Sequence, residues 1–215
     1  MKSLSIICLL GIIIKAGAVE NGPGPFSLTV LEEDLSFAHG CYAVGDIDGD
    51  GFNDIVGAGN TPRLWWVRHD DVEQKHTIAE EIEVGMEVHA ADVDNDGDLD
   101  VLTSGAGFTW CENPLPGGDP AVDAWIPHSI GSHGTGSSGG SHDFTVGDID
   151  GDGKIDAVER NKERPWTIYL QNTPLDFTIF TVDAANDVEG TALGDIDGDG
   201  DLDISDGLAW FACPD

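Results

Sequence analysis

Residues 45–54 read GDIDGDGFND, and the nine-residue pattern DxDxDGxxD inside this stretch occurs four times in the chain. The copies span Asp46–Asp54, Asp92–Asp100, Asp148–Asp156 and Asp195–Asp203. Aspartates at the first, third, fifth and ninth positions, with a backbone carbonyl at the seventh, supply most of the roughly six to eight oxygen ligands that Ca²⁺ takes. Glycine at the sixth position allows the sharp turn that brings these oxygens together. The repeats therefore predict four calcium loops.

The predicted ligands are the aspartates of each loop and the residue at its seventh position, which contributes its backbone carbonyl. An Asp-rich chain could make Asp-rich turns without metal, but four matches exceed what the composition would produce by chance. We expect about four Ca²⁺ ions with a structural role, because the loops show no sign of an open coordination position. The ligand positions are Asp46, Asp48, Asp50, Phe52, Asp54, Asp92, Asp94, Asp96, Asp98, Asp100, Asp148, Asp150, Asp152, Lys154, Asp156, Asp195, Asp197, Asp199, Asp201 and Asp203.

The amino terminus is typical of a secretory signal peptide. Lys2 precedes the apolar run Leu4–Ile14, and Ala16-Gly17-Ala18 supplies small residues for cleavage. The apolar run is too short to cross a bilayer, and no second run of membrane length follows. We therefore predict a secreted, extracellular protein with a signal peptide at 1–18, a short linker at 19–24 and a repeat domain at 25–215.

The charge balance limits the classes of partner. The chain has 9 Lys and Arg against 41 Asp and Glu, which gives a formal net charge of −32. Such a surface repels phosphate groups, so we expect no nucleic-acid partner and no binding to anionic lipids. Three cysteines follow the predicted signal peptide, Cys41, Cys111 and Cys213, and an odd number allows at most one internal disulfide, with the pairing left open.

The spacing of the loops is typical of propeller blades. Their first aspartates are 46, 56 and 47 residues apart, and the longest interval contains the Gly/Ser-rich insertion Gly131–Ser141. Each period contains short runs of β-favouring residues separated by Gly, Asn, Asp and Pro, without helical periodicity. This pattern predicts an all-β fold of four-stranded antiparallel blades, in which each calcium loop joins the first strand of a blade to the second.

The two ends of the repeat region leave two architectures open. Pro25–Leu31 resembles the fourth strand of a blade, and the last copy stops near Pro214 after its third strand. An amino-terminal strand that completes the last blade would close a four-bladed ring, and the alternative is part of a larger propeller. In either case we expect the aligned residues Trp65, Trp110, Trp166 and Trp210 to pack between neighbouring blades.

The stretch GDIDGDG, at Gly45–Gly51, Gly147–Gly153 and Gly194–Gly200, resembles the metal motif of the FG-GAP/VCBS family of calcium-binding β-propellers, the repeats of integrin alpha-subunit heads. The second copy departs from this motif as Ala91–Gly97, ADVDNDG. Family members usually carry seven blades, whereas four repeats are visible here. The resemblance implies a calcium-binding, non-catalytic binding or cell-adhesion module whose partner is a glycan or an extracellular protein.

Two other functions remain open. Some propellers with similar repeats are polysaccharide-degrading enzymes, so the alternative is a lyase or hydrolase with its site at the propeller mouth, and a third possibility is a structural spacer. Catalytic candidates lie at the start of each first strand, where the first and second copies also carry His39 and Glu87. These positions from all four copies would converge on the axis if the first strand is innermost. The candidates are His89, His142, Asp143 and Glu189. The alternative for these residues is a polar lining of a water-filled channel mouth.

A basic cluster in the third copy is a candidate ligand-binding site. Arg160, Lys162 and Arg164 could supply the countercharge for an acidic glycan such as a uronic acid. Glu159 and Glu163 interleave with them, so an exposed turn held by surface ion pairs is the alternative.

Overall fold

The computed structural model describes residues 41–59, 63–105, 107–131, 143–160, 165–182, 190–206 and 208–213. These residues form strands, turns and bends, and the described part of the chain contains no helix that could cross a membrane. The predicted signal peptide, the linker and the strand Pro25–Leu31 lie outside the described residues. So do His39, His142, Lys162, Arg164 and Glu189.

Fifteen strands in the described part of the chain form four antiparallel sheets, which confirms the all-β prediction. Three sheets have four strands in chain order, and the fourth has three described strands. The first sheet comprises β1 (Tyr42–Gly45), β2 (Asp54–Ala58), β3 (Leu64–Arg68) and β4 (Asp71–Ala79). The second comprises β5 (Val88–Ala91), β6 (Asp100–Gly105), β7 (Gly107–Glu112) and β8 (Ile126–Ile130). The third comprises β9 (Asp143–Gly147), β10 (Asp156–Arg160), β11 (Trp166–Thr173) and β12 (Asp176–Val182), and the fourth β13 (Ala192–Gly194), β14 (Asp203–Ser205) and β15 (Trp210–Phe211).

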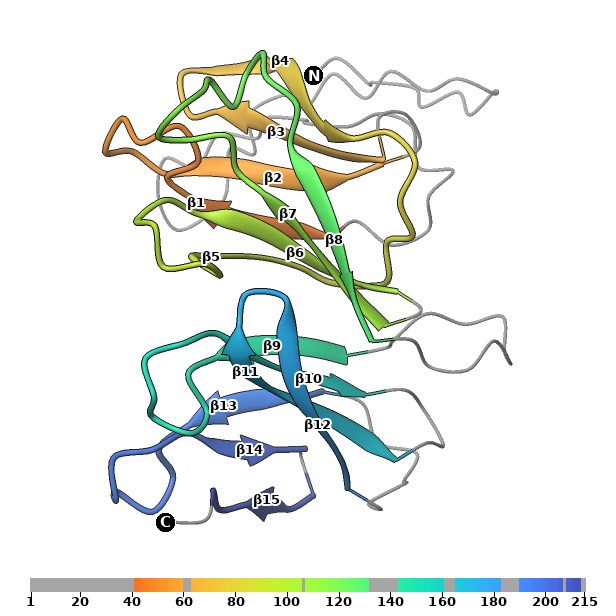
Figure 1. Ribbon diagram of the computed structural model, residues 1–215, viewed down its shortest axis with the longest axis vertical. Helices are drawn as coiled ribbons and strands as arrows, with labels where there is room; N and C mark the ends of the chain where they lie inside the picture. The colour runs from red at the N-terminus through yellow and green to blue at the C-terminus, as the bar shows by residue number, and fades with distance from the viewer. Residues whose placement is uncertain are drawn as a thin grey trace, which may run out of the picture.

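The sheets follow one another along the molecule in chain order (Figure 1). The first strand of each sheet contacts the first strand of the next: β1 lies against β5, β5 against β9, and β9 against β13. This row of first strands places all four Asp-rich loops, which lead from the first strand to the second, at corresponding ends of their sheets. The described residues do not show a closed ring of sheets.

Three apolar clusters fill the spaces between successive sheets. The second residue of each of the first three loops contributes to them: Ile47, Val93 and Ile149 are 0%, 1% and 3% exposed. The equivalent Ile196 of the fourth loop is 48% exposed. The repeat therefore directs this apolar side chain toward the next sheet, and the fourth sheet has no described neighbour to cover it.

Tryptophans pack between sheets as expected in the second and third repeats. Trp110 lies in the cluster between the second and third sheets, and Trp166 in the cluster between the third and fourth. In the first sheet the cluster with the second sheet contains Trp66, the neighbour of the aligned Trp65. Successive residues of a strand face opposite sides, so Trp65 is buried on the other face of its sheet. Trp210 is 44% exposed.

Close packing of successive sheets explains the glycine that precedes the first loop. A Cβ on Gly45 would lie 2.6 Å from Cδ1 of Leu99, the eighth residue of the second loop. Gly147 meets the corresponding Leu202 in the same way, at 3.2 Å. The first glycine of GDIDGDG therefore makes room for the neighbouring loop.

Candidate metal centre

The glycine at the sixth position of each loop turns the backbone as the sequence predicts. The φ values are 90°, 100°, 86° and 105° at Gly51, Gly97, Gly153 and Gly200. Residues other than glycine rarely adopt this backbone region. In the first three loops the N–H of this glycine donates a hydrogen bond to the first aspartate of the loop, at 2.9 to 3.1 Å. In the fourth loop the donor to Asp195 is Gly198 instead, at 2.6 Å.

Three carboxylates converge in every loop. One oxygen from each member of a group lies within 4.8 Å of the others. In the first, second and fourth loops the group is formed by the first, third and fifth aspartates, and in the third loop Asp156 takes the place of the fifth. The groups are Asp46, Asp48 and Asp50; Asp92, Asp94 and Asp96; Asp148, Asp150 and Asp156; and Asp195, Asp197 and Asp199.

The ninth aspartate of each loop is buried and hydrogen-bonded to the backbone on both oxygens. Oδ2 of Asp100 accepts the N–H of Val93, the second residue of the same loop, at 3.0 Å. Its Oδ1 accepts the N–H of Asn113, just beyond β7, at 2.8 Å. Asp54, Asp156 and Asp203 make the same two types of bond. This aspartate therefore links the start of its loop to the backbone just beyond the third strand of the sheet.

Each loop contains one buried carboxylate oxygen that has no hydrogen-bond donor in the described protein and could instead be a ligand of a cation. Oδ1 of Asp46 and Oδ1 of Asp148 are buried, and neither accepts a hydrogen bond from a described residue. The same holds at the seventh position for Oδ2 of Asp98 and Oδ1 of Asp201. A buried carboxylate oxygen without a donor is costly, and a divalent cation would satisfy it. Hard oxygen donors of this kind suit Ca²⁺.

Electrostatics in the second loop lead to the same conclusion. Burial raises the pKa of Asp100 to about 7, against the hydrogen bonds from Asn113 and Val93. Burial and the neighbouring charge of Asp96 raise the pKa of Asp98 to about 7. Without a cation these carboxyl groups would hold protons near neutral pH, whereas a bound divalent ion would favour their ionised forms.

The seventh-position side chains point to differences between the loops. Phe52 is 61% exposed and stacks on His69 with ring centroids 4.7 Å apart. Lys154 pairs with Asp152 of its own loop. In the first loop, the guanidinium of Arg68, at the end of β3, pairs with Asp48 and Asp50. The sequence pattern did not predict this ion pair.

Side-chain amides connect successive loops, which the sequence pattern also did not reveal. Nδ2 of Asn113 donates to the carbonyl of Ile47 in the first loop at 2.9 Å, while its N–H binds Asp100 of the second loop. Gln171 repeats this arrangement one sheet later, between Val93 and Asp156. Asn113 and Gln171 therefore each connect the second residue of one loop, through the side-chain amide, to the ninth aspartate of the next loop, through the backbone N–H.

The described mouth candidates lie between the second and third sheets. Glu87 accepts the N–H of Phe144 at 3.1 Å, and Nε2 of His89 donates to the carbonyl of Phe144 at 2.7 Å. Asp143 and Arg160 face each other across β9 and β10, with Oδ2 and Nη1 4.0 Å apart. Arg160 is 1% exposed, and its guanidinium lies 5.5 Å from the ring centroid of Trp166. The structure thus brings Asp143 and Arg160 together in the interior and uses Glu87 and His89 as contacts between sheets.

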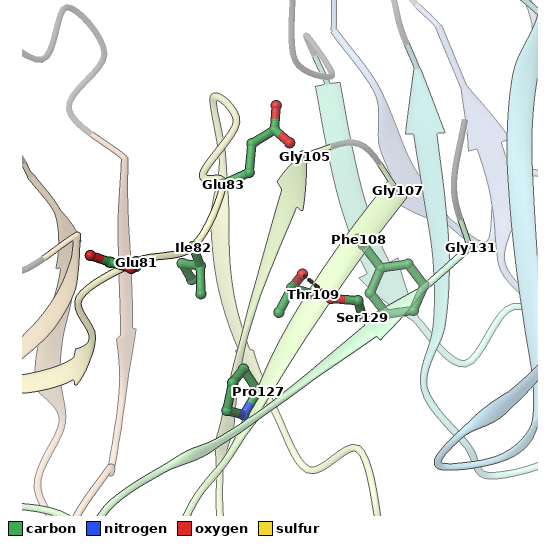
Figure 2. Close-up of a pocket in the computed structure, with 10 residues that line it drawn as sticks. All are labelled: Glu81, Ile82, Glu83, Gly105, Gly107, Phe108, Thr109, Pro127, Ser129 and Gly131. Carbon is green, nitrogen blue, oxygen red and sulfur yellow. Dashed lines mark hydrogen bonds between the residues drawn. The ribbon is translucent and has the colours of Figure 1, made fainter. Parts of the chain in front are cut away.

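A pocket of about 340 Å³ lies beside the second sheet, away from the loops (Figure 2). The hydroxyls of Thr109 and Ser129, on adjacent strands, are 3.4 Å apart at its wall. Glu81 and Glu83, in the segment between β4 and β5, supply carboxylates, and both are exposed. Ile82, Phe108 and Pro127 add apolar surface, and Gly105, Gly107 and Gly131 complete the lining.

Comparison with protein families gives two matches to the FG-GAP-like repeat, at residues 46–103 and 148–204. Each match begins at the first aspartate of one loop and ends shortly after the ninth aspartate of the next, so the two matches together contain all four loops. Comparison with curated proteins found no match.

Proposed function

Because this chain belongs to the FG-GAP-like repeat family, we propose that it is a secreted, calcium-stabilised binding module that presents its surface to an extracellular glycan or protein without catalysis. Convergence of three carboxylates in every loop, with buried oxygens that lack a donor, is the observation that carries the calcium part of the proposal. Bound Ca²⁺ would supply positive charge between these oxygens. The first, third and fifth aspartates would hold it in most loops, with Asp156 replacing the fifth in the third loop.

We further propose that the sheets are blades of a propeller. Contacts between successive first strands support this arrangement, as do the apolar clusters between sheets. The exposed side chains of Ile196 and Trp210 lie where the earlier sheets receive a neighbour.

The pocket beside the second sheet supports a glycan as the ligand. Its paired hydroxyls and exposed carboxylates can exchange hydrogen bonds with sugar hydroxyls, and its volume lies within the range of small-ligand sites. The lyase or hydrolase alternative receives less support from the described residues. Glu87 and His89 already hydrogen-bond the backbone of the third sheet, and Arg160 is buried.

A glycan array probed with the calcium-loaded full chain tests the ligand class. We expect binding to hydroxyl-rich glycans that is weakened by Thr109→Val combined with Ser129→Ala, because these changes remove both hydroxyls and nearly preserve shape. Thr178→Val, which removes an exposed hydroxyl on the third sheet, is the matched control. Absorbance at 235 nm during incubation with acidic polysaccharides would reveal lyase activity, and its appearance would overturn the non-catalytic assignment.

A further inference from the structure

The first calcium loop already contains a cation that belongs to the protein. Arg68, the last residue of β3, directs Nη1 to Oδ2 of Asp48 and Nη2 to Oδ2 of Asp50, the latter at 2.7 Å. Its Nε donates to Oδ1 of Asp70 at 3.0 Å. One guanidinium thus joins two of the three converging carboxylates of the loop to the turn between β3 and β4.

The corresponding position in the second sheet has the opposite charge. Val67 pairs with Ile55, and Cys111 pairs with Val101, so the next residues, Arg68 and Glu112, occupy equivalent positions beside their loops. The first site therefore combines four aspartates with an arginine, whereas the second combines five aspartates with a glutamate. The same register places Leu170 and Ala212 in the third and fourth sheets.

On the basis of the proposed calcium function, we propose that Arg68 is a resident counter-cation that competes with Ca²⁺ for Asp48 and Asp50 and makes the first loop a weaker calcium site than the second. The number of charged ligands around a calcium loop is one of the properties that set its affinity. Only 10% of the Asp48 side chain is exposed, so its charge is screened less than that of a surface carboxylate. Arg68 is 36% exposed and keeps Asp70 as a partner, so it can leave the loop when Ca²⁺ enters.

The third loop also contains an ion pair with a basic side chain, that of Lys154. Its ammonium contacts Asp152, which is not among the three converging carboxylates of that loop, and both side chains are about one third exposed. Arg68 and Lys154 thus pair with aspartates of the first and third loops, whereas the second loop has Glu112 at the position of Arg68. Calcium should therefore fill the second and fourth loops before the first.

Calcium titration calorimetry on the stripped full chain tests this role with Arg68→Gln. We expect the weakest site to bind Ca²⁺ about tenfold more tightly in this variant, because one competing charge is removed. Arg63→Gln is the matched control, since Arg63 directly precedes β3 and the substitution removes the same charge at the opposite end of the strand. In an Asp48→Asn background, Arg68→Gln should produce no further tightening.

Thermal unfolding gives a second measurement. In chelator, Arg68→Gln should lower the melting temperature more than Arg63→Gln does, because the carboxylates of the first loop lose their counter-charge. Saturating Ca²⁺ should shrink this difference. Unchanged affinities in Arg68→Gln, with calcium binding at the other loops intact, would overturn the role of Arg68 and leave the proposed function standing, whereas a lack of calcium binding in every variant would overturn both.

If Arg68→Gln does not fold, Glu112→Gln tests the same principle in the second loop. Removal of this negative charge should weaken one calcium site by a similar factor. Binding equal to that of the unaltered chain would show that the residue at this position does not set the affinity.

Discussion

The side-chain amide of Gln171 donates a 2.8 Å hydrogen bond to the carbonyl of Val93, which lies 78 residues earlier in the chain. Through its own N–H, Gln171 also binds Asp156, so one residue connects the second loop to the third. Asn113 makes the equivalent connection between the first loop and the second. Asp-rich loops that are distant in sequence are therefore joined by a repeated side-chain contact.

Gln171→Ala should destabilise the protein by about 2 kcal/mol, because the buried carbonyl of Val93 loses its donor. The melting temperature should fall by roughly 4 to 8 °C for a chain of this size. Asn172→Ala, at the exposed neighbouring position, should have a much smaller effect. Equal losses in the two variants would show that the contact between the loops contributes little.

Removal of calcium should lower the melting temperature by many degrees. A site occupied at about tenfold its dissociation constant contributes about 1.4 kcal/mol, so four such sites contribute about 6 kcal/mol. Asp94→Ala should remove the share of the second loop, and Asp71→Ala, at the exposed start of β4, should not. A melting curve that is the same after exhaustive chelation would contradict a structural role for calcium.

Gly57→Ala should destabilise the first sheet. A Cβ at this position would lie 2.5 Å from the ring of Trp65, which is fully buried and cannot move into solvent. We expect a loss of about 1–3 kcal/mol in the free energy of unfolding, measured by denaturant titration. Gly117→Ala is the control, because no atom lies within 4 Å of its added Cβ.

The buried thiols should resist modification in the folded protein. Burial raises the pKa of Cys111 to about 12 and that of Cys41 to about 11, and none of the three described cysteines forms a disulfide. At pH 8 a thiol-specific reagent should label half-buried Cys213 first, and Cys41 and Cys111 only as the protein unfolds. Cys213→Ser should remove the fast phase, and rapid labelling that persists in this variant would contradict the prediction.

The raised pKa of Cys111 predicts that the folded protein loses stability at alkaline pH. The pKa of Cys111 is raised in the folded state above its ordinary value of 9.0. Its contribution to stability is therefore fully present below about pH 9 and is lost as the pH rises toward 12. Unfolding titrations across this window should show a smaller loss for Cys111→Ala, which lacks the titrating group, than for the unaltered chain.

The convergence of aspartates within each loop and the four-stranded antiparallel sheets were predictable from the sequence, because both depend on local spacing. The aspartates and the glycine of one loop lie within nine residues, and the turn residues that separate the strands recur with each repeat. The order of the strands within each sheet followed for the same reason, since neighbours in sequence pair as hairpins.

Contacts between sheets could be recognised only in the tertiary structure. The strand register places Arg68 beside Asp48 and Asp50, and in the next sheet places a glutamate at the same position. Alternation along β3 turns Trp66, not Trp65, toward the second sheet. Packing of successive sheets brings Gln171 to Val93. Local spacing thus determined the clusters of aspartates in the loops and the four-stranded sheet that carries each loop. The direction of side chains along the strands and the packing of one sheet on the next determined which residues surround each loop.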